Sequence, residues 1–180
     1  MNNSDLFKKR LDSNSRKNRV HISWKFAYSS VPHAIATFLG SGVLRPGPGT
    51  WGTLAGWGVF EVLNRHLSMS AWVFVILVTF FVGAWASQKT GEDIGVHDHG
   101  SIVIDEVFAI WLVLITVPNT IIWHFLGFLS FRFFDIIKVW PSDYLDRRFK
   151  NGLGVMLDDL SAAIQTIILL QVAFMAIERF

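Results

Sequence analysis

Two long runs without a charged residue limit what this chain can fold into: residues 71–87 and residues 160–177. A run of roughly 20 apolar residues is long enough to cross a lipid bilayer as a helix. Inside a bilayer every backbone N–H and C=O needs a partner within the protein, and a helix provides these partners within one segment. The chain is 52% hydrophobic and 17% charged, against roughly 25% charged in typical soluble domains. We therefore predict an all-α, membrane-embedded helical bundle.

The remaining apolar segments predict further spans. Residues 107–123 and 121–137 form one apolar block, and the sequence PNT at 118–120 is typical of a tight turn between two antiparallel helices. We expect residues 53–67 to form the first membrane-spanning helix. Residues 33–50 contain a Pro- and Gly-rich stretch that disfavours a continuous helix, so we expect a re-entrant segment there. This gives about five spans.

Charge is unevenly distributed along the chain. Residues 1–25 carry seven Lys or Arg and two acidic residues, whereas the rest of the chain carries nine basic and twelve acidic residues. We expect residues 1–30 to form a flexible basic arm near an anionic membrane surface, with a merely solubilising terminus as the alternative. Residues 31–180 are expected to form a single membrane domain. The absence of Cys excludes disulfides and Cys-ligated zinc.

The distribution of Lys and Arg also predicts an orientation, because loops rich in these residues stay in the cytoplasm. If the N-terminus is cytoplasmic, the loops 88–100 and 138–154 lie inside, and the second loop carries four Lys or Arg. The outside loops 68–70 and 118–120 carry none. We therefore expect a multi-pass protein whose N-terminus and two longer loops share one side.

Charged side chains at the edges of the apolar segments are the candidates for chemistry, since a charge in hydrocarbon is costly and usually functional. In this topology, three helices bring five carboxylates and two cations to the cytoplasmic face. They are Asp105, Glu106, Asp135, Asp158 and Asp159, with Arg132 and Lys138. Clustered carboxylates repel unless a cation neutralises them, and oxygen ligands favour Mg²⁺. A divalent metal ion together with Arg and Lys is typical of sites for phosphoryl transfer. Because the protein is expected to lie in a membrane, we expect the phosphate-bearing substrate to be a lipid.

Each of these groups also has a structural explanation. The two acidic pairs could stabilise helix N-termini through the helix dipole. Arg132 and Asp135 have the i, i+3 spacing of a surface ion pair. His97 is a weaker candidate because loop histidines are usually solvated, and a lone Glu61 is more often hydrogen-bonded than a ligand.

Four sequence blocks carry a recognisable pattern: residues 48–55 (PGTWGTLA), 95–106 (GVHDHGSIVIDE), 131–138 (FRFFDIIK) and 152–159 (GLGVMLDD). In order and spacing they resemble the motifs of the phosphatidylglycerophosphatase A family. The resemblance implies an enzyme of the bacterial inner membrane that hydrolyses phosphatidylglycerophosphate to phosphatidylglycerol with Mg²⁺, and no nucleic-acid partner.

The candidate residues lie in these four blocks. As catalytic candidates we take Asp105, Asp135, Lys138, Arg132, His97 and Thr50. As metal ligands we take Asp105, Glu106, Asp135, Asp158 and Asp159. Two alternatives stay open, a phosphatase of another lipid phosphate and a non-enzymatic membrane protein that binds divalent cations. The nucleophile also stays open between a carboxylate and a metal-bound water.

Overall fold

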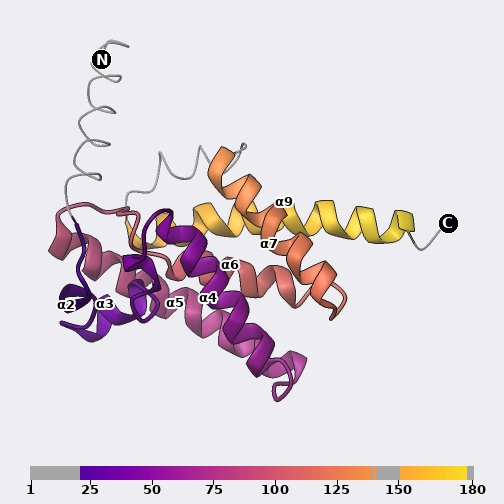
Figure 1. Cartoon of the computed structure of the whole chain (residues 1–180), viewed down its shortest axis with the longest axis horizontal. Helices are drawn as coiled ribbons and strands as arrows, with labels where there is room; N and C mark the ends of the chain where they lie inside the picture. The colour runs from indigo at the N-terminus through magenta and orange to yellow at the C-terminus, as the bar shows by residue number, and fades with distance from the viewer. Residues whose placement is uncertain (1–20, 139, 141–150, 178–180) are drawn as a thin grey trace, which may run out of the picture.

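The computed structural model describes residues 21–138, 140 and 151–177, and every regular element in this part of the chain is a helix (Figure 1). This confirms the all-α prediction. The elements are α2 (Trp24–Ala27), α3 (Val31–Ala36), the 3₁₀ helix η1 (Ser41–Val43), α4 (Pro48–Leu63), α5 (Met69–Ile94), α6 (Ile104–Leu114), α7 (Ile121–Ile137) and α9 (Gly152–Ile177).

Two of the sequence predictions fall partly on residues that the structure does not describe. Of the expected basic arm 1–30, residues 1–20 lie outside the described residues, and the rest includes α2. Residues 141–150, which hold most of the basic residues of the expected cytoplasmic loop, also lie outside the described residues.

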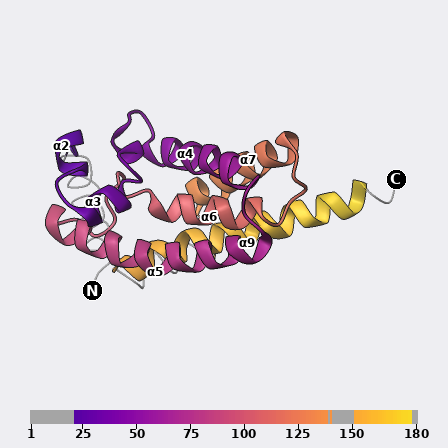
Figure 2. The same ribbon diagram turned by 90° about the horizontal axis from the view of Figure 1, so that it is seen from below.

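Helix α6 forms the centre of the bundle, and α4, α5, α7 and α9 pack around it (Figures 1 and 2). Nine of its eleven residues are buried. A helix that is apolar on all sides belongs in a core rather than at a surface. The ring of Trp72 on α5 contacts both Phe60 of α4 and Trp111 of α6, with ring centroids 4.7 and 5.6 Å apart. Aromatic packing of this kind fixes the three helices against one another.

Two helices, α5 and α9, are long and apolar enough to cross a membrane by length and composition. At 1.5 Å per residue, α6 is only about 16 Å long, roughly half the hydrocarbon thickness of a bilayer. The expected span 107–123 is therefore not confirmed: the helix ends at Leu114, before the predicted turn at 118–120, because Pro118 and the residue before it disfavour its continuation. The prediction of about five spans is supported for α5 and α9 alone.

Helix α4 begins at Pro48, five residues before the predicted start at 53. Proline is tolerated in the first helical turn because its missing N–H has no partner there in any helix. The glycines on the inner face then allow a close approach to α6: a Cβ on Gly52 would lie only 2.5 Å from Cβ of Val103. The backbone exposed by Gly56 accepts a hydrogen bond from Nε1 of Trp111 at 2.7 Å. Packing against α6 thus outweighs the low helix propensity of glycine.

The C-terminal end of α4 changes the number of Lys and Arg residues in the loop that follows it. The helix ends at Leu63 rather than at 67, so Arg65 lies in the connection to α5. That connection is the loop that was expected to carry no Lys or Arg. The charge asymmetry between the two sides is therefore smaller by one cation than the sequence count indicated.

Much of the outer surface of the long helices is apolar. Exposed large hydrophobic side chains include Val73, Phe74, Leu77, Phe81 and Trp85 on α5, Ile122, Phe125, Leu129, Phe133 and Ile136 on α7, and Ile164, Ile168 and Val172 on α9. Soluble monomers rarely expose apolar surface on this scale. These faces are suited to contact with lipid.

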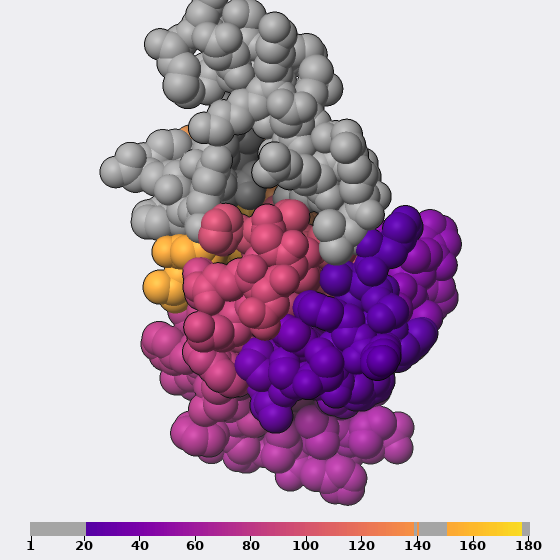
Figure 3. Space-filling view, turned by 90° about the vertical axis from the view of Figure 1, so that its left-hand side faces the viewer, coloured from indigo at the N-terminus to yellow at the C-terminus, as the bar shows by residue number. Residues whose placement is uncertain are grey.

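The short helices close one end of the bundle. In Figure 3 the indigo residues, which include α2 and α3, lie beside the pink residues of the second half of α5, and α3 packs against α5. His33 of α3 contacts Asp93 of α5, with Nε2 and Oδ2 2.9 Å apart. This contact lies next to the loop that connects α5 to α6, which forms part of the site described below.

Candidate active site

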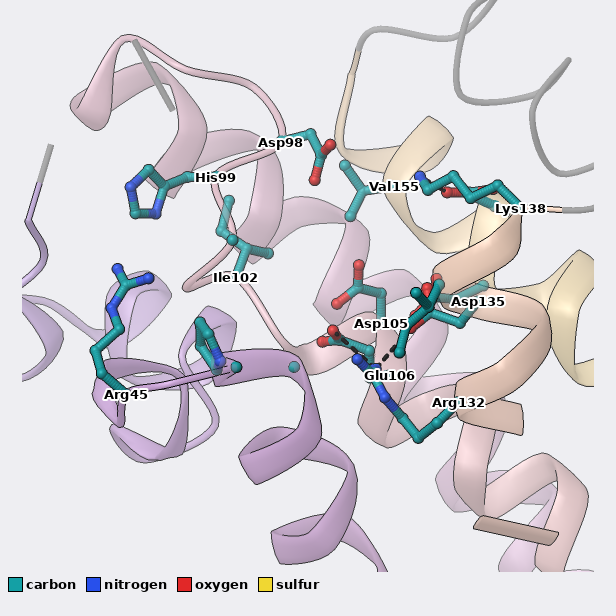
Figure 4. A pocket seen from close by; sticks show the side chains of 17 residues that line it. Arg45, Asp98, His99, Ile102, Asp105, Glu106, Arg132, Asp135, Lys138 and Val155 are labelled. Carbon is teal, nitrogen blue, oxygen red and sulfur yellow. Dashed lines mark hydrogen bonds and ion pairs between the residues drawn. The ribbon is translucent and has the colours of Figure 1, made fainter. Parts of the chain in front are cut away.

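Four helices and two loops meet at a cavity of about 530 Å³ (Figure 4). Seven of its charged lining residues come from the first turn of α6, the end of α7 and the early part of α9, and two more come from the loops. The seven are Asp105, Glu106, Arg132, Asp135, Lys138, Asp158 and Asp159, and the loops add Arg45 and Asp98. The structure therefore brings together all seven charged residues that the sequence predicted to share one face.

Three of the carboxylates form a tight cluster. One oxygen each of Asp105, Glu106 and Asp159 lies within 4.8 Å of the others. Asp105 Oδ1, Glu106 Oε2 and Asp159 Oδ2 are buried and have no hydrogen-bond partner among the described residues. Buried oxygens of like charge repel, and leaving them without a partner is costly. Oxygens of this kind are suitable ligands for a hard divalent cation such as Mg²⁺.

The two other carboxylates contact the cations. Arg132 Nη1 lies 2.6 Å from Oδ2 of Asp135, which is the i, i+3 pair expected from the sequence, and also 3.5 Å from Oε1 of Glu106 on α6. Lys138 Nζ contacts Oδ2 of Asp158 on α9. The ion pairs thus connect three helices, which a solvated pair on the surface of one helix cannot do.

The first turn of α4 lies against this cluster. Gly49 is buried, and a Cβ at that position would overlap Oε1 of Glu106 and lie 3.1 Å from Nη1 of Arg132. Only glycine allows the backbone to come this close. The N-cap residue Gly47 offers no side-chain hydrogen bond, so the first backbone N–H groups of α4 have no side-chain capping partner within the described part of the chain. Such groups at a helix N-terminus favour anions.

Asp158 and Asp159 differ from their predicted position. The sequence placed them at the start of a helix, but α9 begins earlier, at Gly152, and both lie beyond its first turn. The early start is possible because Gly152 packs against the backbone of α5, with its N–H donating to Oε1 of Gln88 at 2.7 Å. The helix dipole acts within the first turn, so it does not account for this pair.

Two predicted residues are not part of the cavity lining. His97 is exposed, and Thr50 lies one residue beyond the part of α4 that lines the cavity. Instead the neighbouring Asp98 and His99 line it. His99 is buried, and its Nδ1 accepts a hydrogen bond from the backbone N–H of Ser101 at 3.1 Å. The sequence does not distinguish between these adjacent side chains, because an irregular loop has no periodicity.

Glu61 lies far from the cavity, as a structural residue. Its Oε1 accepts a hydrogen bond from Nε1 of Trp57 at 2.7 Å and lies 2.5 Å from Nδ1 of the buried His124. Twelve residues separate it from Gly49 along α4, which corresponds to about 18 Å. The expectation that Glu61 is hydrogen-bonded is confirmed.

In a comparison with known protein families, residues 34–174 of the chain match the family model described as Phosphatidylglycerophosphatase A. The chain belongs to this family. A protein of Haemophilus influenzae named Phosphatidylglycerophosphatase A is 42% identical over 137 residues, which cover 76% of this chain and 84% of that protein. The protein of the same name from Escherichia coli is 38% identical over 133 residues, covering 73% and 77%. These matches confirm the resemblance and the prediction of a phosphatase.

A third relative carries a different name. A protein of Bacteroides thetaiotaomicron named "Putative phosphatidylinositol-3-phosphatase" is 35% identical over 152 residues, which cover 81% of this chain and 94% of that protein. No solved structure matches the chain.

Proposed function

We propose that this chain hydrolyses phosphatidylglycerophosphate to phosphatidylglycerol and phosphate, with Mg²⁺ as its cofactor. The observation that carries the proposal is the cavity in which the oxygens of three carboxylates lie within 4.8 Å of one another, beside Arg132 and Lys138. Family membership supports the substrate, because two relatives carry the name of this activity.

The metal would be held by Asp105, Glu106 and Asp159, because each has a buried oxygen without a hydrogen-bond partner among the described residues, which fits a cation that prefers oxygen ligands. When bound, Mg²⁺ supplies Lewis-acid stabilisation of the charge on the phosphoryl oxygens. Asp135 and Asp158 were predicted as further ligands. Since they contact Arg132 and Lys138, we assign to them the role of holding these two cations in place.

Arg132 and Lys138 would bind the phosphomonoester. The planar guanidinium of Arg132 can present two parallel donors to phosphate oxygens, and Lys138 adds a point charge. Carboxylates on neighbouring helices hold both side chains in place. Little side-chain conformational entropy is therefore lost when they bind the substrate. The first backbone N–H groups of α4, which Gly49 brings to the cluster, would complete the anion site.

The substrate is a lipid because the site lies at one end of the two helices that are suited to cross a membrane. The second half of α5 and the start of α9 meet at the Gln88–Gly152 contact, and the cavity is lined by the loop that follows α5 and by early residues of α9. A site at this depth can receive a head group while the acyl chains stay in the bilayer. We place it at the cytoplasmic face of the bacterial inner membrane, on the side favoured by the Lys and Arg count of the sequence.

Phosphate release from a panel of lipids tests the proposal. The purified chain in detergent receives phosphatidylglycerophosphate, phosphatidic acid, lysophosphatidic acid and phosphatidylinositol 3-phosphate, the last because of the name of one relative. We expect the highest kcat/KM for phosphatidylglycerophosphate, loss of turnover in EDTA, and recovery with Mg²⁺. A preference for another lipid contradicts the substrate assignment, and full activity in EDTA contradicts the metal.

A further inference from the structure

One cation of the cavity differs from the others in its surroundings. Arg132 and Lys138 contact carboxylates. Arg45, which also lines the cavity, has no ion pair with a carboxylate among the described residues. Its only hydrogen bond in this part of the chain is a long one, from Nη2 to Oγ of Ser101 at 3.5 Å. A guanidinium that faces a cavity without an acidic partner is available to an anionic ligand.

Arg45 also lies on a different wall of the cavity. Figure 4 shows it beside His99, across from Arg132, Asp135 and Lys138. It belongs to the loop between η1 and α4, whereas the other two cations belong to α7 and its C-cap. The cavity of about 530 Å³ therefore has cationic groups on two opposite walls, with the carboxylate cluster nearer to one of them.

The proposed substrate has a matching charge distribution. Phosphatidylglycerophosphate carries one phosphate as a terminal monoester and a second as the diester that joins the glycerol to the lipid. Only the monoester is removed, and it belongs beside the carboxylate cluster. The diester then needs a second cation some distance away.

We propose that Arg45 binds the phosphodiester of the head group and so makes the enzyme selective for lipids that carry a second phosphate beside the one that is removed. This inference rests on the proposed function. Arg45 is a specificity residue in this role, since it contacts the part of the substrate that does not react. The head group would be held at both ends, which places the monoester at the cluster.

Competitive inhibition by two soluble compounds tests this role. One is the head group without acyl chains, glycerophosphoglycerol phosphate, which has both phosphates, and the other is glycerol 3-phosphate, which has only the monoester. We expect Arg45→Gln to raise the inhibition constant of the first compound about tenfold or more and to leave that of the second within about twofold, as the loss of a hydrogen bond to a charged group predicts. Arg45→Lys should give an intermediate inhibition constant for the first compound, because Lys keeps the positive charge but lacks the paired N–H donors of the guanidinium.

Two control variants separate recognition from charge and structure. Arg65→Gln removes the same charge from an exposed position at the other end of α4 and should change neither inhibition constant. Ser101→Ala removes the hydrogen bond that Arg45 donates to Ser101 and should also keep the ratio of the two constants. A ratio changed by Ser101→Ala would mean that Arg45 acts through the shape of its loop.

The remaining outcomes are also decisive. An equal loss for both compounds in Arg45→Gln, or no loss for either, overturns the role of Arg45 in binding the diester. The KM for phosphatidylglycerophosphate gives a second measurement, which should rise about tenfold while kcat stays within about twofold. If the unaltered chain does not hydrolyse this lipid at all, the proposed function is wrong. This outcome differs from the results that would overturn the role of Arg45, so the two proposals can be tested separately.

Discussion

Replacing Asp159 by Asn should make the metal-free protein more stable and the enzyme inactive. Asn has nearly the same shape as Asp but no charge, so the change removes one of the three carboxylates whose oxygens lie within 4.8 Å of one another. The result distinguishes a metal site from a structural cluster, because a structural residue would lose stability when replaced.

The magnitude follows from the separation of the oxygens. At an effective dielectric constant of about 20, two unit charges 4.8 Å apart repel by about 3.5 kcal/mol. Asp159 has two such neighbours, and partial protonation of the cluster without metal reduces the repulsion. We expect a net gain of about 1–3 kcal/mol in EDTA, which corresponds to a rise in Tm of several degrees for a chain of this size.

Thermal unfolding in detergent, with and without Mg²⁺, measures both effects. Mg²⁺ at about 100 times its Kd should stabilise the unaltered chain by about 2.7 kcal/mol, whereas Asp159→Asn should show no such shift. Its kcat should fall at least 100-fold, or about 2.7 kcal/mol of barrier. Glu61→Gln is the matched control: it should keep both the Mg²⁺ shift and the activity, and lose some stability through its bond to His124.

A lower Tm for Asp159→Asn in EDTA, together with an unchanged Mg²⁺ shift, would refute this reasoning. The cluster would then contribute to folding through hydrogen bonds, and the metal would bind elsewhere. A normal rate in the variant would remove Asp159 from the site altogether.

Three further predictions follow from the structure. Gly49→Ala should lower kcat at least 100-fold in a folded protein, because its Cβ displaces the carboxylate and guanidinium beside it; a normal rate in a phosphate-release assay would contradict this. Lys138→Met should lower kcat/KM about 10- to 100-fold, whereas Lys138→Arg should retain more activity. In intact cells a single Cys at Asn119 should react with an impermeant reagent, and one at Lys89 should react only after permeabilisation; the reverse result contradicts the orientation.

The gathering of the site residues could be predicted from the sequence. Charged residues are rare in segments this apolar, and each must reach a membrane edge or a partner. Asp105 and Glu106 open a helix, and Arg132 and Asp135 end another, so a shared face followed from the alternation of the helices. In the structure these residues line one cavity.

The helix boundaries could not be predicted in the same way. The start of α4 depends on glycines that fit against Val103, and hydropathy contains no information on that contact. Helix α6 is as apolar as a span but serves as the core of the bundle, because other helices cover it on all sides. Apolar composition favours both environments, so only length and packing separate them.

The loop residues of the site also needed the structure. His97 and His99 are two positions apart in the loop that follows the left-handed C-cap residue Gly95 of α5, yet the first is exposed and the second is buried. Arg45 is one of 16 basic residues in the sequence. What distinguishes it is its place on the cavity wall and its lack of an ion pair with a carboxylate among the described residues.

The position of a bound ion tests the central claim most directly. Mn²⁺ can replace Mg²⁺ at oxygen sites, and its anomalous scattering locates it in crystals of the full chain. We predict one strong peak between the carboxylates of Asp105, Glu106 and Asp159, at about 2.0–2.3 Å from their oxygens, and its loss in Asp159→Asn. A peak at another position, with these three carboxylates unliganded, would contradict the account.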